Sequence, residues 1–189
     1  MNIETTRLRI RDLCSDDAAF VLELTNEPAF IANIGNKGLE TLEDAVQFLA
    51  EGSWTCQPKP GYGQFLVELK ESGEPVGICG LLYRESLEVS DVGFAMLSKF
   101  RGRGFASESA EAMMQYGYAE LGVEEIVGLT SAENLPSIRV LEKLGMTFDR
   151  MVKMRGDGAA DTALYRNAEC GVRSAECGGR LVDGAPSCS

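Results

Sequence analysis

The chain has 189 residues, of which 44% are hydrophobic and 25% charged, a composition typical of one globular domain with a full core. Its formal net charge of −11 argues against a general nucleic-acid binder, which needs a basic face. No apolar run approaches the roughly 18 residues needed to span a membrane, and the N-terminal stretch lacks the apolar segment of a secretory signal. We therefore expect a cytoplasmic protein without nucleic-acid or membrane partners.

The cysteine and histidine content limits the chemistry further. The six cysteines form no C-x-x-C pair, so we expect reduced thiols. Histidine is absent, which excludes Ser-His-Asp and Cys-His catalysis and disfavours a zinc centre, so we expect no metal. Cys79 lies in an apolar stretch where nothing would lower its pKa, which disfavours it as a nucleophile. Any acid–base work falls to Asp, Glu, Tyr, Ser, Cys or water.

The first third of the chain predicts one strand and two helices. Hydrophobic periodicity and breakers give a strand over 6–11, a helix over 18–25, a loop over 30–39 and a helix over 42–51. Ser15 is the expected N-cap of the first helix. Thr41 is the expected cap of the second, with Asp44 in the capping-box position. Pro28 is expected to break the chain between them.

The middle of the chain predicts a meander of antiparallel strands. Strands are expected over 64–70, 75–84 and 92–97, with a hairpin turn over 71–74 and an irregular connection over 54–63. Gly77 and Gly80 are candidate bulges in the second of these strands.

The last part predicts two helices and a closing hairpin. The expected elements are a helix over 107–121, a strand over 125–130, a helix over 137–144, a strand over 146–155, a turn over 156–158 and a strand over 161–166. This order indicates a mixed α/β (α+β) domain over residues 1–166. Residues 167–189, rich in Cys, Gly and Ser, are predicted to be a poorly packed tail.

A glycine-rich basic turn with the sequence RGRGFA, residues 101–106, joins the strand over 92–97 to the next helix. The first N–H groups of a helix lack internal partners and its dipole adds positive charge there, so this geometry can hold phosphate. A P-loop would need Lys-Ser or Lys-Thr after Gly104, and a dinucleotide fingerprint would need glycine at Ser107, so both motifs fail. The alternative is a tight turn with a solvated basic edge, and six residues do not decide between the two.

The motif R-x-x-G-x-A, formed by Arg101, Gly104 and Ala106, resembles the acetyl-CoA pyrophosphate loop of the GNAT superfamily of N-acetyltransferases. Four further stretches resemble the ribosomal-protein (alanine/serine) acetyltransferase branch: ETTRLRIR at 4–11, EPVGICG at 74–80, DVGFAM at 91–96 and NLPSIRVLEKLGM at 134–146. Their order over most of the chain makes the resemblance more specific than the turn alone. It implies the GNAT fold: a central, mostly antiparallel mixed sheet of six to seven strands, flanked by helices and splayed between its fourth and fifth strands.

The resemblance implies acetyl-CoA as co-substrate and transfer of its acetyl group to a primary amine, by direct attack in a ternary complex. The pantetheine arm would pair with the strand ending at Leu97, the pyrophosphate would meet the glycine turn, and Asn134 would bind the pantetheine. The implied cofactor-binding residues are Phe94, Ala95, Met96, Leu97, Arg101, Gly102, Arg103, Gly104, Phe105, Ala106, Ser107, Asn134, Ser137 and Leu141.

The catalytic assignment is less direct. Many relatives carry a tyrosine acid where this chain has Leu141 and a glutamate base where it has Leu129. In this branch a serine occupies the position of Ser137, which is the expected proton donor, and Asp91 and Glu88 are the candidate bases, acting through water. The alternatives are a helix-cap role for Ser137 and a solvated strand-end carboxylate at Asp91. Asn134 has its own alternative, as a plain turn residue.

The missing tyrosine and glutamate keep a second hypothesis open, a non-catalytic acetyl-CoA-binding or sensing domain. A third hypothesis is a nucleotide-phosphate binder. For the transferase, the acceptor would be a protein N-terminus or a small amine, held between the N-terminal helices, the connection over 54–63 and the last hairpin. Family members are often monomers or dimers, so we expect a monomer or a homodimer.

Overall fold

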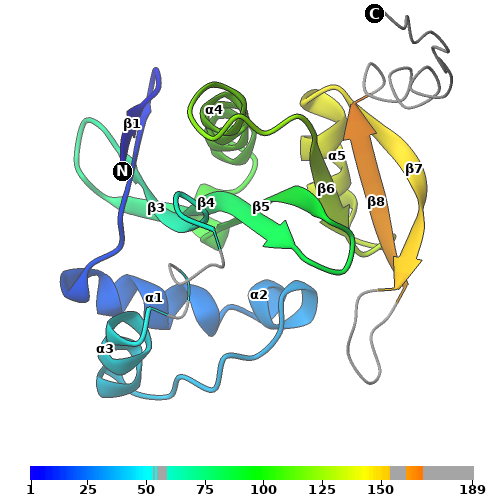
Figure 1. The fold of residues 1–189 in the computed structure, drawn as a ribbon. Coiled ribbons are helices and arrows are strands. Elements are labelled where there is room, and N and C mark those ends of the chain that lie inside the picture. The colour runs from blue at the N-terminus through cyan, green and yellow to red at the C-terminus, as the bar shows by residue number, and fades with distance from the viewer. Residues whose placement is uncertain (53, 55–58, 154–160, 168–189) are drawn as a thin grey trace, which may run out of the picture.

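Eight strands form one mixed sheet in the computed structural model, which describes residues 1–52, 54, 59–153 and 161–167 (Figure 1). The strands are β1 (Asn2–Glu4), β2 (Leu8–Arg11), β3 (Gly63–Leu69), β4 (Pro75–Arg84), β5 (Val89–Met96), β6 (Ile126–Thr130), β7 (Met146–Lys153) and β8 (Asp161–Asn167). Their spatial order is β1-β2-β3-β4-β5-β6-β8-β7, and each neighbouring pair is antiparallel except β5 and β6. The α/β fold class is confirmed, with one or two more strands than expected because Asn2–Glu4 pairs with β2 as an edge strand.

Helices cover both faces of the sheet. They are α1 (Ala18–Thr25), α2 (Pro28–Asn33), α3 (Leu42–Ala50), α4 (Phe105–Ala119) and α5 (Leu135–Lys143), with short 3-10 turns η1 (Ser15–Asp17) and η2 (Ser98–Phe100). In Figure 1, α1, α2 and α3 lie below the central strands, while α4 lies above them and α5 beside β6. None of the helices in the described part of the chain is long and apolar enough to cross a membrane.

The alternation of β4 side chains assigns its residues to these two faces. A Cβ placed on Gly117 of α4 would lie 2.7 Å from a Leu81 methyl, so Leu81 faces α4. The even-numbered residues Leu82 and Arg84 therefore face the α1–α3 side. Residues that pair directly across the sheet share a face, so Asp91, which pairs with Leu82, faces that side too.

Two details of the N-terminal half differ from the sequence prediction. Residues 28–33 form helix α2 instead of a loop, because Pro28 occupies its first turn, where a missing N–H costs nothing. Ser15 does not cap α1, since the chain turns earlier: Cys14 precedes η1, and Asp17 then precedes α1. Thr41 caps α3 as predicted, accepting from Asp44 N–H in a capping box. The predicted turn over 156–158 and nearly all of the tail lie outside the described residues.

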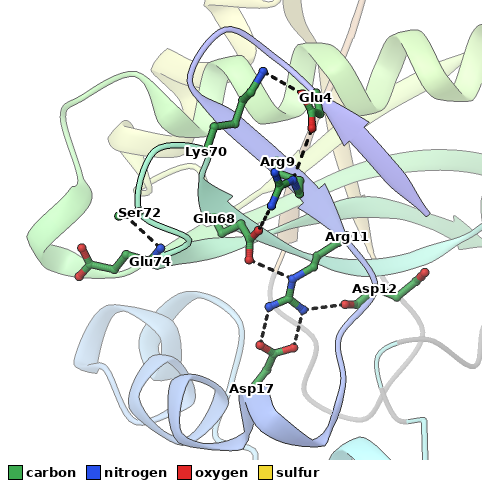
Figure 2. A network of polar contacts seen from close by, with 9 residues as sticks. All are labelled: Glu4, Arg9, Arg11, Asp12, Asp17, Glu68, Lys70, Ser72 and Glu74. Carbon is green, nitrogen blue, oxygen red and sulfur yellow. Dashed lines mark hydrogen bonds and ion pairs between the residues drawn. The ribbon is translucent and has the colours of Figure 1, made fainter.

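Two buried carboxylates join the N-terminal helices to the sheet (Figure 2). Arg11 on β2 donates to both oxygens of Asp17 at 2.8 Å and to Glu68 on β3 at 2.9 Å, and Arg9 donates to Glu68 at 3.0 Å. Burial alone would raise the pKa of Asp17, but its hydrogen bonds from Arg11 and Cys14 hold the pKa below its ordinary value. This network fixes the start of α1 against β2 and β3.

Candidate active site

A cavity of about 830 Å³ passes between the two faces of the sheet at β5 and β6. Its lining comes from the C-terminal half of β5, the turn after it, the first turn of α4, the end of β6 and one face of α5. On the other face it is lined by α2, Trp54, Gln64 and the even-numbered residues of β4. The cavity thus joins two chemically different sides of the sheet.

The pairing of β5 with β6 is short where the cavity opens. Parallel Cα pairs join Ser90 to Ile126 and Asp91 to Val127, and β5 continues beyond them to Met96. Just past these pairs, Asp91 Oδ1 accepts from Leu129 N–H at 3.2 Å, so a side chain replaces the next main-chain link. This bond satisfies a Leu129 N–H that lies beyond the residues paired with β5.

The glycine-rich turn over residues 101–106 has the geometry expected of an anion-binding site. Gly102 and Gly104 have φ of 77° and 82°, the left-handed region that glycine adopts at little cost. Gly104 is the N-cap of α4, and the N–H groups of Phe105, Ala106 and Ser107 have no hydrogen-bond partner among the described residues. Three free N–H groups at the positive end of a helix dipole attract an anion.

Two carboxylates outside the cavity, Glu108 and Glu27, hold this turn in place. Glu108 accepts from Thr5 Oγ1 at 2.6 Å, from Arg7 N–H at 2.8 Å and from Arg7 Nε at 2.7 Å. Arg7 Nη1 in turn donates to the Arg103 carbonyl at 2.9 Å. Burial alone would raise the pKa of Glu108, but these hydrogen bonds and the charge of Arg7 hold it below its ordinary value.

Arg101 is engaged in the same scaffold and is only partly available to a phosphate. It donates through Nε to the Met96 carbonyl at 2.9 Å and pairs through Nη2 with Glu27. Glu27 also accepts from Ser98 N–H at 2.7 Å, which ties the turn to the start of α2. Arg101 stays a predicted cofactor-binding residue, and the two bonds of its side chain shape the turn.

The N-terminus of α5 supplies a polar group on the opposite wall. Asn134 is its N-cap, and Oδ1 accepts from Ser137 N–H at 3.3 Å, so Ser137 is not the cap. Ser137 Oγ makes no hydrogen bond with the described residues, which leaves it available to a ligand in the cavity. Leu141 is buried against Gly128 of β6 and also lines the cavity.

Asp91 is the buried carboxylate of the site, 2% exposed. Its Oδ2 accepts from Arg84 Nε at 2.9 Å and Nη2 at 2.6 Å. Burial raises the pKa of Asp91, while Arg84 and the Leu129 N–H oppose that change. Asp91 is therefore not a solvated strand-end group but an internal one, positioned by three hydrogen bonds.

The structure brings together most, but not all, of the residues that the sequence singled out. The predicted residues that line the cavity are Asp91, Phe94, Ala95, Met96, Arg101, Gly102, Gly104, Phe105, Ala106, Ser107, Asn134, Ser137 and Leu141. Leu97 lies in the core, and the Arg103 guanidinium lies over the Phe100 ring. Glu88 is exposed in the β4–β5 turn with φ of 55°, apart from the lining residues.

Several lining residues were missed by the sequence reasoning. Arg139 and Lys143 are four residues apart on α5, and this helical spacing next to Asn134 could have indicated a basic face. Gln64 and Arg84 gave no such signal, because tertiary pairing of β3, β4 and β5 is what brings them to the cavity. No cluster of three or more metal-ligating residues occurs in the described ranges.

Comparison with known proteins decides the family. Residues 7–147 match the Acetyltransferase (GNAT) domain. The chain belongs to the GNAT acetyltransferase family. Members of this family transfer acetyl groups from acetyl-CoA, and the free N–H groups at Phe105, Ala106 and Ser107 fit the anionic diphosphate of that co-substrate.

Similar proteins agree with this GNAT assignment. The chain is 30% identical over 146 residues to an uncharacterized N-acetyltransferase, YnaD, of Bacillus subtilis, covering 77% of this chain and 82% of YnaD. The crystal structure of a GNAT-family acetyltransferase from Bacillus anthracis is 28% identical, with a TM-score of 0.72, covering 88% of this chain and 97% of that one. At 15% identity, a spermidine N-acetyltransferase from Vibrio cholerae, solved with CoA and spermine, shares the fold: its TM-score is 0.67, and 86% of this chain and 95% of that one are covered.

Proposed function

We propose that this protein is an acetyl-CoA-dependent N-acetyltransferase that moves the acetyl group directly to a primary amine in a ternary complex. The observation that carries the proposal is the cavity joining both faces of the sheet at β5 and β6. One side of the cavity has the N-terminal turn of α4, and the other side is lined by polar and aromatic residues. Such a passage lets a cofactor and an acceptor meet from opposite faces, which direct attack requires.

On the cofactor side, the diphosphate of acetyl-CoA would accept hydrogen bonds from the free N–H groups in the first turn of α4. The pantetheine arm would run along the end of β5 and receive a hydrogen bond from the side-chain amide of Asn134. The basic residues Arg139 and Lys143 would add positive charge for the remaining phosphate. Acetyl-CoA supplies the activated acetyl group, and these residues bind and orient it.

In the reaction, the amine must lose a proton and the departing thiolate must gain one. Ser137 is the proposed donor, because its hydroxyl lines the cavity and has no other partner among the described residues. Asp91 is the proposed proton acceptor, reached through water, since it is the one carboxylate among the described lining residues. Burial raises the pKa of Asp91, which moves it toward that of a useful base.

A second candidate, a non-catalytic acetyl-CoA-binding domain, is favoured by one observation: no tyrosine lies among the described residues of the cavity lining. Calorimetry with CoA, together with thiol release from acetyl-CoA across a panel of amines and peptides, separates the two. We expect binding plus turnover with at least one acceptor, and a fall in kcat of at least about tenfold in Ser137→Ala. Binding without turnover on every acceptor would favour the binding domain. The family branch and the oligomeric state stay predictions.

A further inference from the structure

The acceptor side of the cavity combines a buried amide with an excess of positive charge. We infer that the acceptor of this protein is a small primary amine that also carries a carboxylate, as a free amino acid does; this inference rests on the proposed transferase function. In this arrangement Gln64 orients the amino nitrogen of the acceptor.

Gln64 lies on β3 with its side chain over Gly93 of β5. A Cβ placed on Gly93 would lie 2.8 Å from Nε2 of Gln64. The residue is 8% exposed, and its Oε1 is buried without a hydrogen-bond partner among the described residues. A buried acceptor left unpaired is costly, so a ligand N–H at this position would be favourable. Gly93 has no side chain on this face, so the Gln64 amide packs directly over its backbone. A neutral amine can donate one N–H to Oε1 and keep its lone pair for attack.

The charged groups on this side are Arg84, Asp91 and Lys37. Arg84 commits Nε and Nη2 to Asp91, and its Nη1 makes no hydrogen bond within the described chain. Lys37 is exposed at the rim and has no ion-pair partner in the described ranges. Arg84 and Asp91 offset each other, so Lys37 leaves the subsite positive. A ligand carboxylate could therefore bind Arg84 Nη1, with Lys37 adding attraction.

The same charges disfavour other acceptors. A polyamine would meet Arg84 and Lys37, and the one carboxylate it could pair with, Asp91, already holds three donors. Cationic groups in the subsite repel a charged polyamine, and they also favour the neutral form of a bound amine, which is the form that attacks. A peptide N-terminus has an amide where a free amino acid has its carboxylate, so it would lose the attraction as well.

An aromatic and aliphatic wall completes the subsite. The Gln64 N–H donates to the Trp54 carbonyl at 2.9 Å, and the Trp54 ring lies 6.3 Å from that of Phe30 and 5.2 Å from that of Phe48. Phe30, Ile34 and Leu82 also line this part or its surroundings. These surfaces fit the apolar side chain of an amino acid such as leucine or phenylalanine.

The test compares acceptors that differ in one charge. Thiol release from saturating acetyl-CoA is measured with phenylalanine, phenylalaninamide and spermidine, and again with leucine and leucinamide. We expect kcat/KM to favour each free acid over its amide by about fivefold or more, with spermidine the poorest, as an attraction by two cationic groups would give. The amino group of each amide is less basic than that of the free acid, so more of it is in the neutral form that attacks. Intrinsic reactivity therefore favours the amides, and a preference for the free acids must come from the binding site.

Variants tie the preference to the proposed residues. Lys37→Met should lower the acid-to-amide ratio about three- to fivefold, the size of an exposed ion pair. The control Lys70→Met, in the β3–β4 turn where Lys70 pairs with Glu4, should leave the ratio unchanged. Gln64→Leu should raise the KM of every acceptor about tenfold and leave that of acetyl-CoA unchanged.

Turnover of the amides or of spermidine at or above the level of the free acids would overturn the inference and leave the transferase proposal standing. An unchanged ratio in Lys37→Met would also overturn it. Binding of acetyl-CoA without turnover of any acceptor would overturn both.

Discussion

Glu108 connects the phosphate-binding turn to the N-terminal strands, and its replacement tests how that turn is held. The variant Glu108→Gln keeps the size and one acceptor oxygen but removes the charge. Thr5 and the Arg7 N–H can still donate, whereas the charge-assisted contact with the Arg7 guanidinium weakens. Arg7 would then hold the Arg103 carbonyl less firmly.

The cost can be bounded from these contacts. The Arg7 side chain is 46% exposed, so its ion pair with Glu108 is worth up to about 1 kcal/mol. Glu108 lies in the first turn of α4, where a negative charge gains about 0.3–1 kcal/mol from the helix dipole. We therefore expect Glu108→Gln to lower the free energy of unfolding by about 1–2 kcal/mol at pH 7. A looser turn should also raise the Kd for CoA about three- to tenfold.

Urea unfolding across pH provides the assay, because the sign of the effect is fixed. The folded-state pKa of Glu108 lies below its ordinary value, so its contribution to stability is complete above the unfolded-state pKa and is lost as the pH falls through the folded-state pKa. The gap between wild type and Glu108→Gln should therefore narrow below about pH 4.5. Glu111→Gln, at an exposed site one turn further along α4, is the matched control. Equal losses in the two variants, or a gap that does not depend on pH, would refute this reasoning.

Two further predictions concern burial in other parts of the fold. Burial raises the pKa of the Cys79 thiol to about 12, so iodoacetamide at pH 8 should label the exposed Cys14 and leave Cys79 unmodified in the folded protein; peptide mapping that finds equal labelling would contradict its burial. Arg11→Gln removes the guanidinium shared by the buried Asp17 and Glu68, and it should lower the free energy of unfolding by about 2–4 kcal/mol in urea. A loss below about 0.5 kcal/mol would mean that this network does not hold α1.

Local signals predicted the elements that their own residues determine. Helix α4 begins directly after Gly104, whose backbone has the left-handed conformation that only glycine readily adopts. Helix α3 begins at the Thr41 capping box. Strand β4 has the predicted bounds, and a register shift of the β3–β4 pair next to Gly77 agrees with the bulge expected there.

Caps and short helices were harder to predict, because several residues compete for one position. Pro28 is a breaker inside a helix but a good first residue of one, and the sequence does not separate these roles. Asn134 and Ser137 could each cap α5, and the capping role belongs to Asn134 because the helix starts at Leu135. This difference frees the Ser137 hydroxyl, so it matters for function.

The cofactor half of the site could be predicted, and the acceptor half could not. The cofactor half is largely one continuous strand-turn-helix segment, so a motif around Gly104 describes it. The acceptor half draws on Lys37, Gln64 and Arg84, which meet only through sheet register and helix packing. The residues lining that half carry more positive than negative charge, although the whole chain has a formal net charge of −11.

The central claim is that free N–H groups at the start of α4 bind the diphosphate of CoA. Gly104 and Gly122 flank that helix with φ of 82° and 63°, so alanine at either should cost about 1–2 kcal/mol of folding free energy. Calorimetric titration with CoA should show affinity weakened at least tenfold in Gly104→Ala and unchanged in Gly122→Ala. Wild-type affinity in a folded Gly104→Ala protein would contradict the account.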